Sequence, residues 1–256
     1  MENKFILSST QPFILYCNSK NRENLNEPNS LINLKLAFPP LHIKRITLLT
    51  AIIPNTFYTF RADQYVTNNR FDFVDSVGIK TATITPGSYT YSTFITELTT
   101  RLALVSPDVY NITYNQNTLK LTITSSSPLF QILGLTGPNV LYNILYFIGF
   151  NAVDTVAGAV QIAPNPINLG SPKELFIKCS NFQTPIHDTA NKFTALFQIG
   201  INSGFGDIIY YEQFNRHESG INVEQRTMNS IYLELVDENG RLLLPNSDWS
   251  CLLRFD

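Results

Sequence analysis

The chain has 256 residues, of which 44% are hydrophobic and 15% are charged, and its formal net charge is −2. This length supports a sizeable core in one large domain or two smaller ones. The absence of basic runs argues against a dedicated nucleic-acid binder, which normally carries a basic patch or stripe. A surface poor in charge is weakly protected against self-association, which suits a protein whose faces are covered by partners.

Three cysteines, Cys17, Cys179 and Cys251, are far apart in the sequence and have no metal-binding spacing. They predict free thiols that behave as small buried hydrophobic residues in a reducing compartment. Nothing in the sequence calls for a cofactor or a metal.

One long stretch, from Leu121 to Val153, has no charged residue. Prolines, glycines and polar residues interrupt it, and its purely apolar piece from Ile144 to Phe150 is too short to span a bilayer. We therefore expect this region to be buried inside the fold or in a subunit contact.

Strand patterns dominate the chain. "SLINLKLAF" at 30–38 alternates, with Ile32, Leu34 and Leu36 on one face, and predicts a half-buried strand that ends at two prolines. A second apolar strand is expected at 43–60. "RFDFVD" and "KTATITPG" are shorter strand candidates.

A helix is expected from Ser92 to Leu104, where apolar residues fall near helical spacing after threonines and a serine that can cap its start. Glu97 and Arg101, four residues apart, can form an ion pair on it. The alternating residues of 109–124 then predict a hairpin around "NQN".

Further strands are expected at 173–179, 192–201, 229–237 and 249–255. Many short strands with one helix predict an all-β fold, an antiparallel sandwich or barrel. The helix and hairpin between about 85 and 125 are the expected insertion between core strands.

No catalytic motif stands out. The sequence has no G-x-S-x-G, P-loop or G-x-G-x-x-G pattern. Asp72 and Asp75 form only a generic carboxylate pair for a glycosidase. The three histidines are expected in turns or on the surface, and the polar cluster at 210–226 is expected to be solvated or to form intersubunit ion pairs.

Several segments, in this order, resemble a known family. They are "LINLKLAFPPLHIKRITLLTAIIPNTFYTF", "ITPGSYTYSTFITELTTRL", "TYNQNTLKLTIT", "YFIGF" and "NVEQRTMNSIYLELVDENGRLLLPNSDWSCLLRFD". Together they resemble the minor capsid, or penton, proteins of virophages, Polinton-like viruses and related double-stranded DNA viruses. The resemblance covers most of the chain and is weakest at 61–80 and 150–215.

The resemblance implies a single jelly-roll, an antiparallel β-sandwich, over residues 1–256. An insertion or projecting subdomain is expected around 85–170, and an N-terminal arm that lies along a neighbour at 1–29. The implied function is structural: a homopentamer closes the five-fold vertex of an icosahedral virion and contacts major capsid protein hexamers and other minor capsid proteins. Assembly is expected in the host cytoplasm or a virus factory, without enzymatic activity, specific nucleic-acid binding or a membrane span.

Two other functions are alternatives to this one. A lectin-like or receptor-binding β-sandwich would use exposed loops around 61–70 and 202–222, and a hydrolase would need Asp72 or Asp75. For the capsid function, the candidate interface consists of three apolar and three polar side chains. These are Phe147, Ile148, Phe150, Arg216, His217 and Glu218.

Overall fold

The computed structural model divides into two compact units. Met1–Phe57 and Pro172–Asp256 form the first unit, and Tyr58–Ser171 form a second unit inserted into it. The residues described are 12–36, 43–170, 172–182, 186–187, 194–213, 220–226 and 228–256.

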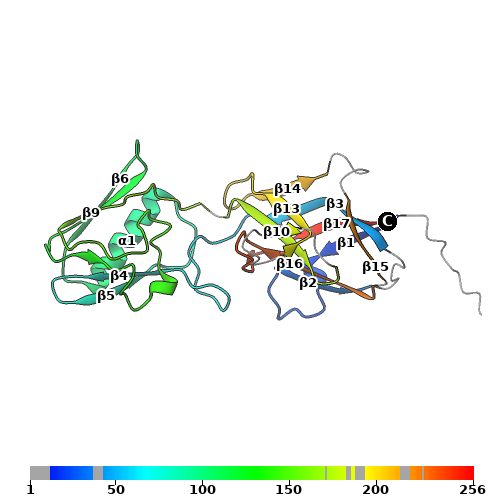
Figure 1. The fold of residues 1–256 in the computed structure, drawn as a ribbon, viewed down its shortest axis with the longest axis horizontal. Helices are drawn as coiled ribbons and strands as arrows, with labels where there is room; N and C mark the ends of the chain where they lie inside the picture. The colour runs from blue at the N-terminus through cyan, green and yellow to red at the C-terminus, as the bar shows by residue number, and fades with distance from the viewer. Residues whose placement is uncertain are drawn as a thin grey trace, which may run out of the picture. The chain divides into compact units, whose positions relative to one another are not determined.

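The first unit is built of antiparallel strands (Figure 1). They are β1 (Phe13–Asn18), β2 (Leu31–Lys35), β3 (Ile43–Pro54), β10 (Glu174–Cys179), β11 (Ile186–His187), β12 (Thr194–Ala195), β13 (Phe197–Gly200), β14 (Ile208–Glu212), β15 (Ile221–Arg226), β16 (Ser230–Val236) and β17 (Ser250–Phe255). One sheet, here called the β17 sheet, has the order β1-β17-β3-β14, and β15 also pairs with β3. The other, the β16 sheet, has the order β13-β10-β16-β2.

This strand order is that of a jelly-roll. Eight strand positions follow along the chain: β1, β2, β3, β10, β13, β14 with β15, β16 and β17. The first pairs with the eighth, the second with the seventh, the third with the sixth and the fourth with the fifth. Such nested antiparallel pairing, split between two sheets, is how a jelly-roll wraps its chain, so the predicted fold class is confirmed.

The facing sides of the two sheets form one hydrophobic core. Alternation along β2 and β16 directs Ile32, Ile231 and Leu233 inward, and all three side chains are fully buried. The inward side of β17 contributes Leu253 in the same way. The alternation predicted for 30–38 therefore describes the buried face of this strand correctly.

The N-terminal arm expected at 1–29 is part of the β-sandwich from Phe13 onward. Phe13–Asn18 is β1, and it pairs with β17 over six residues. The expected arm is therefore a strand of the sandwich from this point, because the apolar run "FILY" supplies side chains to both faces of a sheet. Residues 1–11 lie outside the described part.

One end of the pairing between β1 and β17, where Asn18 lies opposite Ser250, is held by side chains. Ser19, in the short 3₁₀ turn η1 (Ser19–Asn21), donates from its hydroxyl to Asp248 at 2.7 Å and accepts the Trp249 amide at 3.0 Å. The Trp249 indole is 1% exposed and donates to the Asn29 carbonyl at 2.7 Å. The ring fills the core and its N–H finds a partner, as a buried tryptophan requires.

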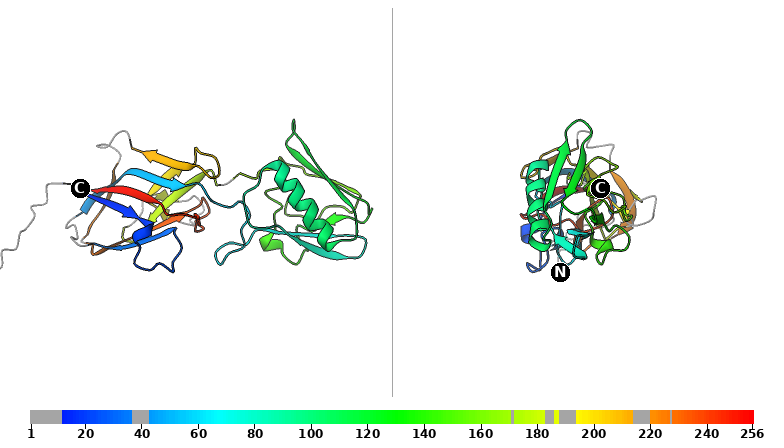
Figure 2. Two further views of the ribbon diagram at one scale, coloured as in Figure 1. Left: turned by 180° about the vertical axis from the view of Figure 1, so that it is seen from behind. Right: turned by 90° about the vertical axis from the view of Figure 1, so that its left-hand side faces the viewer.

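The inserted unit has its own strands, helix and core. Its elements are β4 (Arg70–Val74), β5 (Ile79–Thr83), α1 (Tyr91–Val105), β6 (Tyr110–Asn115), β7 (Lys120–Ser125), β8 (Gln131–Ile132), the 3₁₀ turn η2 (Val140–Tyr142) and β9 (Val160–Ile162). They form two three-stranded sheets, β5-β4-β8 and β6-β7-β9. Figure 2 shows α1 lying alongside these strands, and it contacts β5 and β6.

The helix forms where the sequence predicts it. Thr90 caps its start, with reciprocal side-chain bonds to Thr93, which satisfies amides that have no partner within the helix. Phe94, Leu98 and Leu102 then recur on one face and are fully buried. The predicted ion pair between Glu97 and Arg101 is present at 2.7 Å.

The inserted unit begins earlier than the sequence suggested, at Tyr58 rather than near 85. The cause is aromatic packing: Phe60 stacks on Phe94 of α1 at 5.3 Å, and Phe73 of β4 packs edge-on against Tyr110 of β6 at 5.8 Å. The strands before the helix therefore belong to the same core as the helix–hairpin segment.

Trp249 gives a direct test of the sandwich core. Trp249→Ala should lower the free energy of unfolding of the jelly-roll by about 3–5 kcal/mol, because it leaves a large cavity. Trp249→Phe should cost about 1–3 kcal/mol, because the Asn29 carbonyl loses its partner. Urea titration followed by circular dichroism measures both.

The matched control is Leu25→Ala at a 69% exposed position, which should change stability by less than about 0.5 kcal/mol. Because the inserted unit has a separate core, two unfolding transitions are expected, and only one should move. Equal effects of Trp249→Phe and Leu25→Ala would contradict this description of the core.

Candidate interaction surfaces

Asp72 holds the inserted unit together. Its carboxylate, 1% exposed, accepts from the Thr81 hydroxyl at 2.6 Å and from the Asn139 amide at 2.6 Å. A side chain at Gly137 would collide with it, since a Cβ there would lie 2.6 Å from Oδ2. Asp72 therefore ties β5 to the 137–139 loop, and its oxygens are occupied by structural hydrogen bonds.

Asp75 has a similar structural task. It is 1% exposed and accepts from the amides of Val77 and Gly78, both at 2.8 Å, which closes the turn between β4 and β5. Burial alone would raise the pKa of Asp75, but the nearby Ser106 hydroxyl and the two amides outweigh it and hold the pKa below its usual value. Asp72 and Asp75 thus stabilise two different connections, which gives no support to their use as a glycosidase pair.

The three thiols converge in the jelly-roll, although they are distant in the sequence. Cys17 and Cys251 face each other on β1 and β17, and all three cysteines are buried and free, as predicted. Burial raises the pKa of Cys179 to about 12. The hydrogen bond with Cys17 and burial raise the pKa of Cys251. Among the described residues, no group of three or more Cys, His, Asp or Glu side chains is arranged to hold a metal ion.

The predicted apolar interface residues lie in the inserted unit, not on its surface. Ile148 is fully buried and Phe150 is 4% exposed, and the half-buried Phe147 packs edge-on against Phe60 at 5.4 Å. Gly149, at φ +81°, allows this close packing, because a Cβ there would lie 2.2 Å from the Asn165 carbonyl.

Buried Ile148 and Phe150 cannot contact another subunit in this conformation. In the sequence, an apolar run looks the same whether its own unit or a partner covers it, and here the inserted unit covers these two side chains. The polar candidates Arg216, His217 and Glu218 lie outside the described residues.

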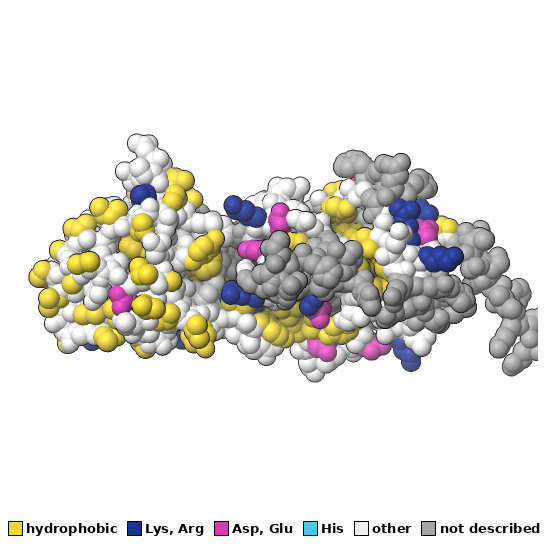
Figure 3. Space-filling view, viewed as in Figure 1, with side chains coloured by type: hydrophobic (Ala, Val, Ile, Leu, Met, Phe, Trp, Pro, Cys, Tyr) yellow, Lys and Arg dark blue, Asp and Glu magenta, His cyan; other side chains and the backbone are white. Residues whose placement is uncertain are grey.

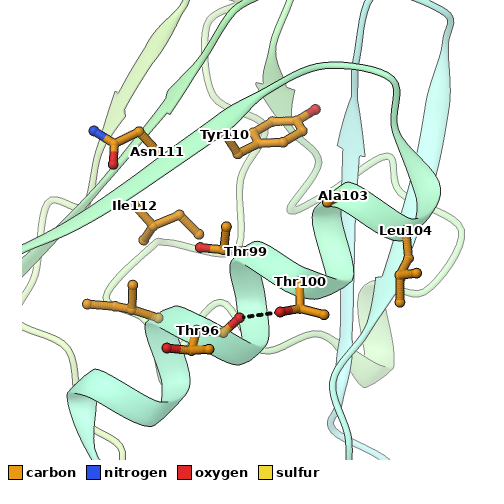
Figure 4. Close-up of a pocket in the computed structure, with 9 residues that line it drawn as sticks. Thr96, Thr99, Thr100, Ala103, Leu104, Tyr110, Asn111 and Ile112 are labelled. Atoms are coloured by element: carbon orange, nitrogen blue, oxygen red, sulfur yellow. Dashed lines mark hydrogen bonds between the residues drawn. The ribbon is translucent and has the colours of Figure 1, made fainter.

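A shallow groove of about 630 Å³ runs between α1 and β6. Figure 4 shows Thr99 of the helix opposite Ile112 of the strand, and Thr96, Thr100 and Asn111 also belong to the lining. Its lining has no charged side chain, and the Thr100 hydroxyl is bonded to the Thr96 carbonyl at 2.8 Å. The groove therefore offers no carboxylate, imidazole, amine or thiol, and its polar groups are hydroxyls and an amide.

The outer side of the β17 sheet carries a group of exposed apolar and aromatic side chains. Tyr16 on β1 lies beside half-buried Leu252 on β17, and Ile52 on β3 lies beside Tyr210 on β14. Beside the charged Glu212 and Arg254, this outer face carries six apolar or aromatic side chains. They are Ile14 (55% exposed), Tyr16 (54%), Ile52 (43%), Ile208 (60%), Tyr210 (52%) and Leu252.

The outer side of the β16 sheet has the opposite character. An ion pair at 2.9 Å joins Lys178 to Glu234 there, and Lys35 and Gln198 are exposed. The side of an antiparallel sheet that faces water is normally polar. The apolar outer face of the β17 sheet therefore stands out as a surface suited to burial.

The inserted unit has few charges, as its face in Figure 3 shows. Between Tyr58 and Ser171 only eleven residues are Asp, Glu, Lys or Arg, and several of these are bonded internally. Arg61 pairs with Asp63 at 2.7 Å, and Asp154 accepts from the Leu135 amide at 2.8 Å. The remaining surface consists largely of Thr, Ser, Asn and aliphatic side chains.

No protein-family model and no curated protein matches the chain. Among solved structures, it is similar to the crystal structure of selenomethionine-labelled mavirus penton protein. The identity is 12% and the TM-score is 0.49, over 96% of this chain and 99% of that chain. Within the described residues, no helix is long and apolar enough to cross a membrane.

The buried thiols should be unreactive in the folded protein. The pKa values of Cys179 and Cys251 are raised, and all three thiols are buried. A thiol-reactive disulfide reagent at pH 8 should therefore label none of the three cysteines rapidly, because the reacting species is an accessible thiolate. All three should react once the chain is unfolded in urea. The control variant Leu25→Cys places a thiol at an exposed position and should label at once. Native labelling of Cys179 at the rate of that control would contradict its burial.

The inserted unit should be sensitive to acid. Burial raises the pKa values of Asp63 and Glu97, but hydrogen bonds from Arg61 and from Thr85 outweigh it, and both pKa values are lowered. Backbone amide bonds lower the pKa of Asp154, and that of Asp75 is lowered as described above. A lowered pKa stabilises the folded state above the unfolded value of about 4, and this contribution is lost as the pH falls through the folded value.

Thermal unfolding followed at pH 7 and at pH 3 should therefore show a lower melting temperature for the inserted unit at pH 3. Asp154→Asn should reduce the difference between the two pH values. An inserted unit with the same melting temperature at both would contradict the role of these carboxylates.

Proposed function

We propose that the chain is a structural protein of an icosahedral virion, namely the penton subunit. Five copies close each vertex and contact the surrounding major capsid protein and other minor capsid proteins. The protein resides in the virion, is assembled in the host cytoplasm or a virus factory, and performs no catalysis. The sequence motifs and the complete jelly-roll support this reading.

The observation that carries the proposal is the apolar outer face of the β17 sheet. A surface with two tyrosines and four aliphatic side chains, beside Arg254, has the composition of a buried protein interface. Contiguous apolar patches of this kind on soluble proteins mark interaction sites.

A five-fold ring needs two different contact surfaces on every subunit, because its interface is heterologous. The outer face of the β17 sheet, with its six apolar or aromatic side chains, and the part of the β16 sheet that carries the Lys178–Glu234 ion pair supply two different surfaces. In the proposed ring, the outer face of the β17 sheet is buried against a different surface of the neighbouring copy.

Native mass spectrometry of the purified chain tests this proposal. We expect a species of five times the 28.9 kDa chain mass. The variant Ile14→Asp with Tyr16→Asp should weaken each subunit contact at least about tenfold, because it buries unpaired charge. Gln198→Asp, on the outer side of the β16 sheet, is the matched control and should leave the assembly unchanged.

Imaging of assembled particles should place the chain at the vertices. A strictly monomeric protein that is absent from virions would refute the proposal. A glycan array in which the isolated monomer binds strongly and saturably would favour the lectin-like alternative instead.

A further inference from the structure

Two of the three cysteines lie directly opposite each other in the β17 sheet. In the antiparallel pair of β1 and β17, the Cα partner of Cys17 is Cys251. Both side chains belong to the core between the sheets and are 0% and 2% exposed. A hydrogen bond links the two thiols. The two sulfur atoms therefore lie in contact across the strand pair.

The type of strand pairing sets the spacing of these two cysteines. Close by, the Ser19 amide donates to the Trp249 carbonyl at 2.9 Å, as in a hydrogen-bonded pair of an antiparallel ladder. Such pairs recur at every second residue, and Cys17 and Cys251 are the next one. Their Cα atoms are therefore about 5.5 Å apart, within the range of about 4.4–6.8 Å that a disulfide spans.

The third thiol is not placed for the same bond. Cys179 lies on β10 in the other sheet, and its thiol donates to the side-chain oxygen of Asn181 at 3.4 Å. Packed sheets lie about 10 Å apart, whereas cysteines with Cα atoms more than about 7 Å apart cannot be joined without backbone movement. The geometry thus selects one pair of cysteines out of the three.

β1 is the strand whose movement gives access to this pair. It lies at the edge of its sheet, with β17 on one side and, among the described residues, no strand on the other. Segments with few neighbours open locally at a lower free-energy cost than the centre of a sheet. When β1 separates, Cys17 leaves the core and uncovers Cys251. In the closed pair both thiols are shielded, which agrees with the slow labelling expected above.

We propose that Cys17 and Cys251 form a reversible disulfide when the chain meets an oxidising small-molecule disulfide such as oxidised glutathione. The thiolate of one cysteine attacks the glutathione disulfide, which forms a mixed disulfide and releases one glutathione thiolate. The thiolate of the second cysteine then attacks the mixed disulfide, which forms the protein disulfide and releases the second glutathione. Two protein thiols are oxidised, one glutathione disulfide is reduced, and the two protons pass to the glutathione thiolates.

The bond joins β1 to β17, two strands from opposite ends of the chain. Closing so long a loop restricts the unfolded chain, which stabilises the folded jelly-roll. The bond also prevents β1 from separating, and β1 carries Ile14 and Tyr16 of the apolar outer face. This face is then held in place by a covalent bond as well as by the backbone ladder.

The geometry also makes the bond reducible. Opposed Cβ atoms in a hydrogen-bonded pair lie near the upper end of about 4.5–5.5 Å, whereas a disulfide brings them to about 3.5–4.5 Å. β1 must therefore move toward β17, and the strain of this movement favours reduction, since strained disulfides are the labile ones. The thiols accordingly stay free in a reducing cytosol and become bonded outside it, a setting that rests on the proposed virion function.

Oxidation of the purified full chain tests the proposal. The reduced chain is incubated with a series of ratios of oxidised to reduced glutathione, and the remaining thiols are then blocked with iodoacetamide. A non-reduced digest should contain a pair of peptides that links Cys17 to Cys251. The melting temperature of the jelly-roll should rise by about 5 °C or more. Dithiothreitol should reverse both changes.

The matched control is Cys179→Ala, which removes a buried thiol outside the pair. This variant should form the same linked peptides and show the same rise in melting temperature. Cys17→Ala should form no disulfide within the chain and show no rise. Each variant is compared with its own reduced form, so a loss of stability caused by the substitution itself does not affect the comparison.

Three outcomes would overturn the proposal. One is a chain that keeps three free thiols at the most oxidising ratio, both as wild type and as the Ile14→Asp, Tyr16→Asp variant. Another is a disulfide that involves Cys179 or joins two chains. The third is a link between Cys17 and Cys251 that appears only after unfolding in urea. The Ile14→Asp, Tyr16→Asp variant should form the bond whether or not the wild type is a pentamer, so the two proposals can fail separately.

Discussion

The pairing of β1 with β17 is the contact on which the jelly-roll unit depends. It joins residues more than two hundred positions apart, and Ser19 and Trp249 hold one end of it. Without it, β17 would pair only with β3, and the core would lose the contacts made by Cys17 beside Cys251. Such non-local pairing carries a large entropic cost of closure, which the buried side chains between the two sheets must offset.

The same pairing creates the apolar outer face. β1 is an edge strand with apolar side chains on both sides, and the inward side alone is covered by the core. Edge strands of monomeric proteins are usually protected by charge or by proline. The exposed Ile14 and Tyr16 are therefore best explained by a partner that covers them, as in the proposed ring.

Much of the fold follows from local patterns. The alternation at Leu31–Lys35, the cap at Thr90 and the hairpin around "NQN" each involve neighbouring residues, and all three occur as predicted. Patterns of this kind do not reveal whether an apolar run is covered by its own unit or by a partner subunit. The sequence around Ile148 and Phe150 shows only that it is apolar, which fits burial in the fold as well as a subunit contact, and the inserted core that buries them is built from distant aromatic residues such as Phe60.

The inserted unit is one continuous stretch of chain, whereas the jelly-roll is assembled from segments on both sides of it. On the ribosome, residues Tyr58–Ser171 can therefore leave the exit tunnel and fold while β10 and all later strands are still being made. During that interval β1, β2 and β3 lack most of their partners and expose apolar edges. A nascent chain of this kind is a natural client for chaperones, and the length of the insertion sets how long that exposure lasts.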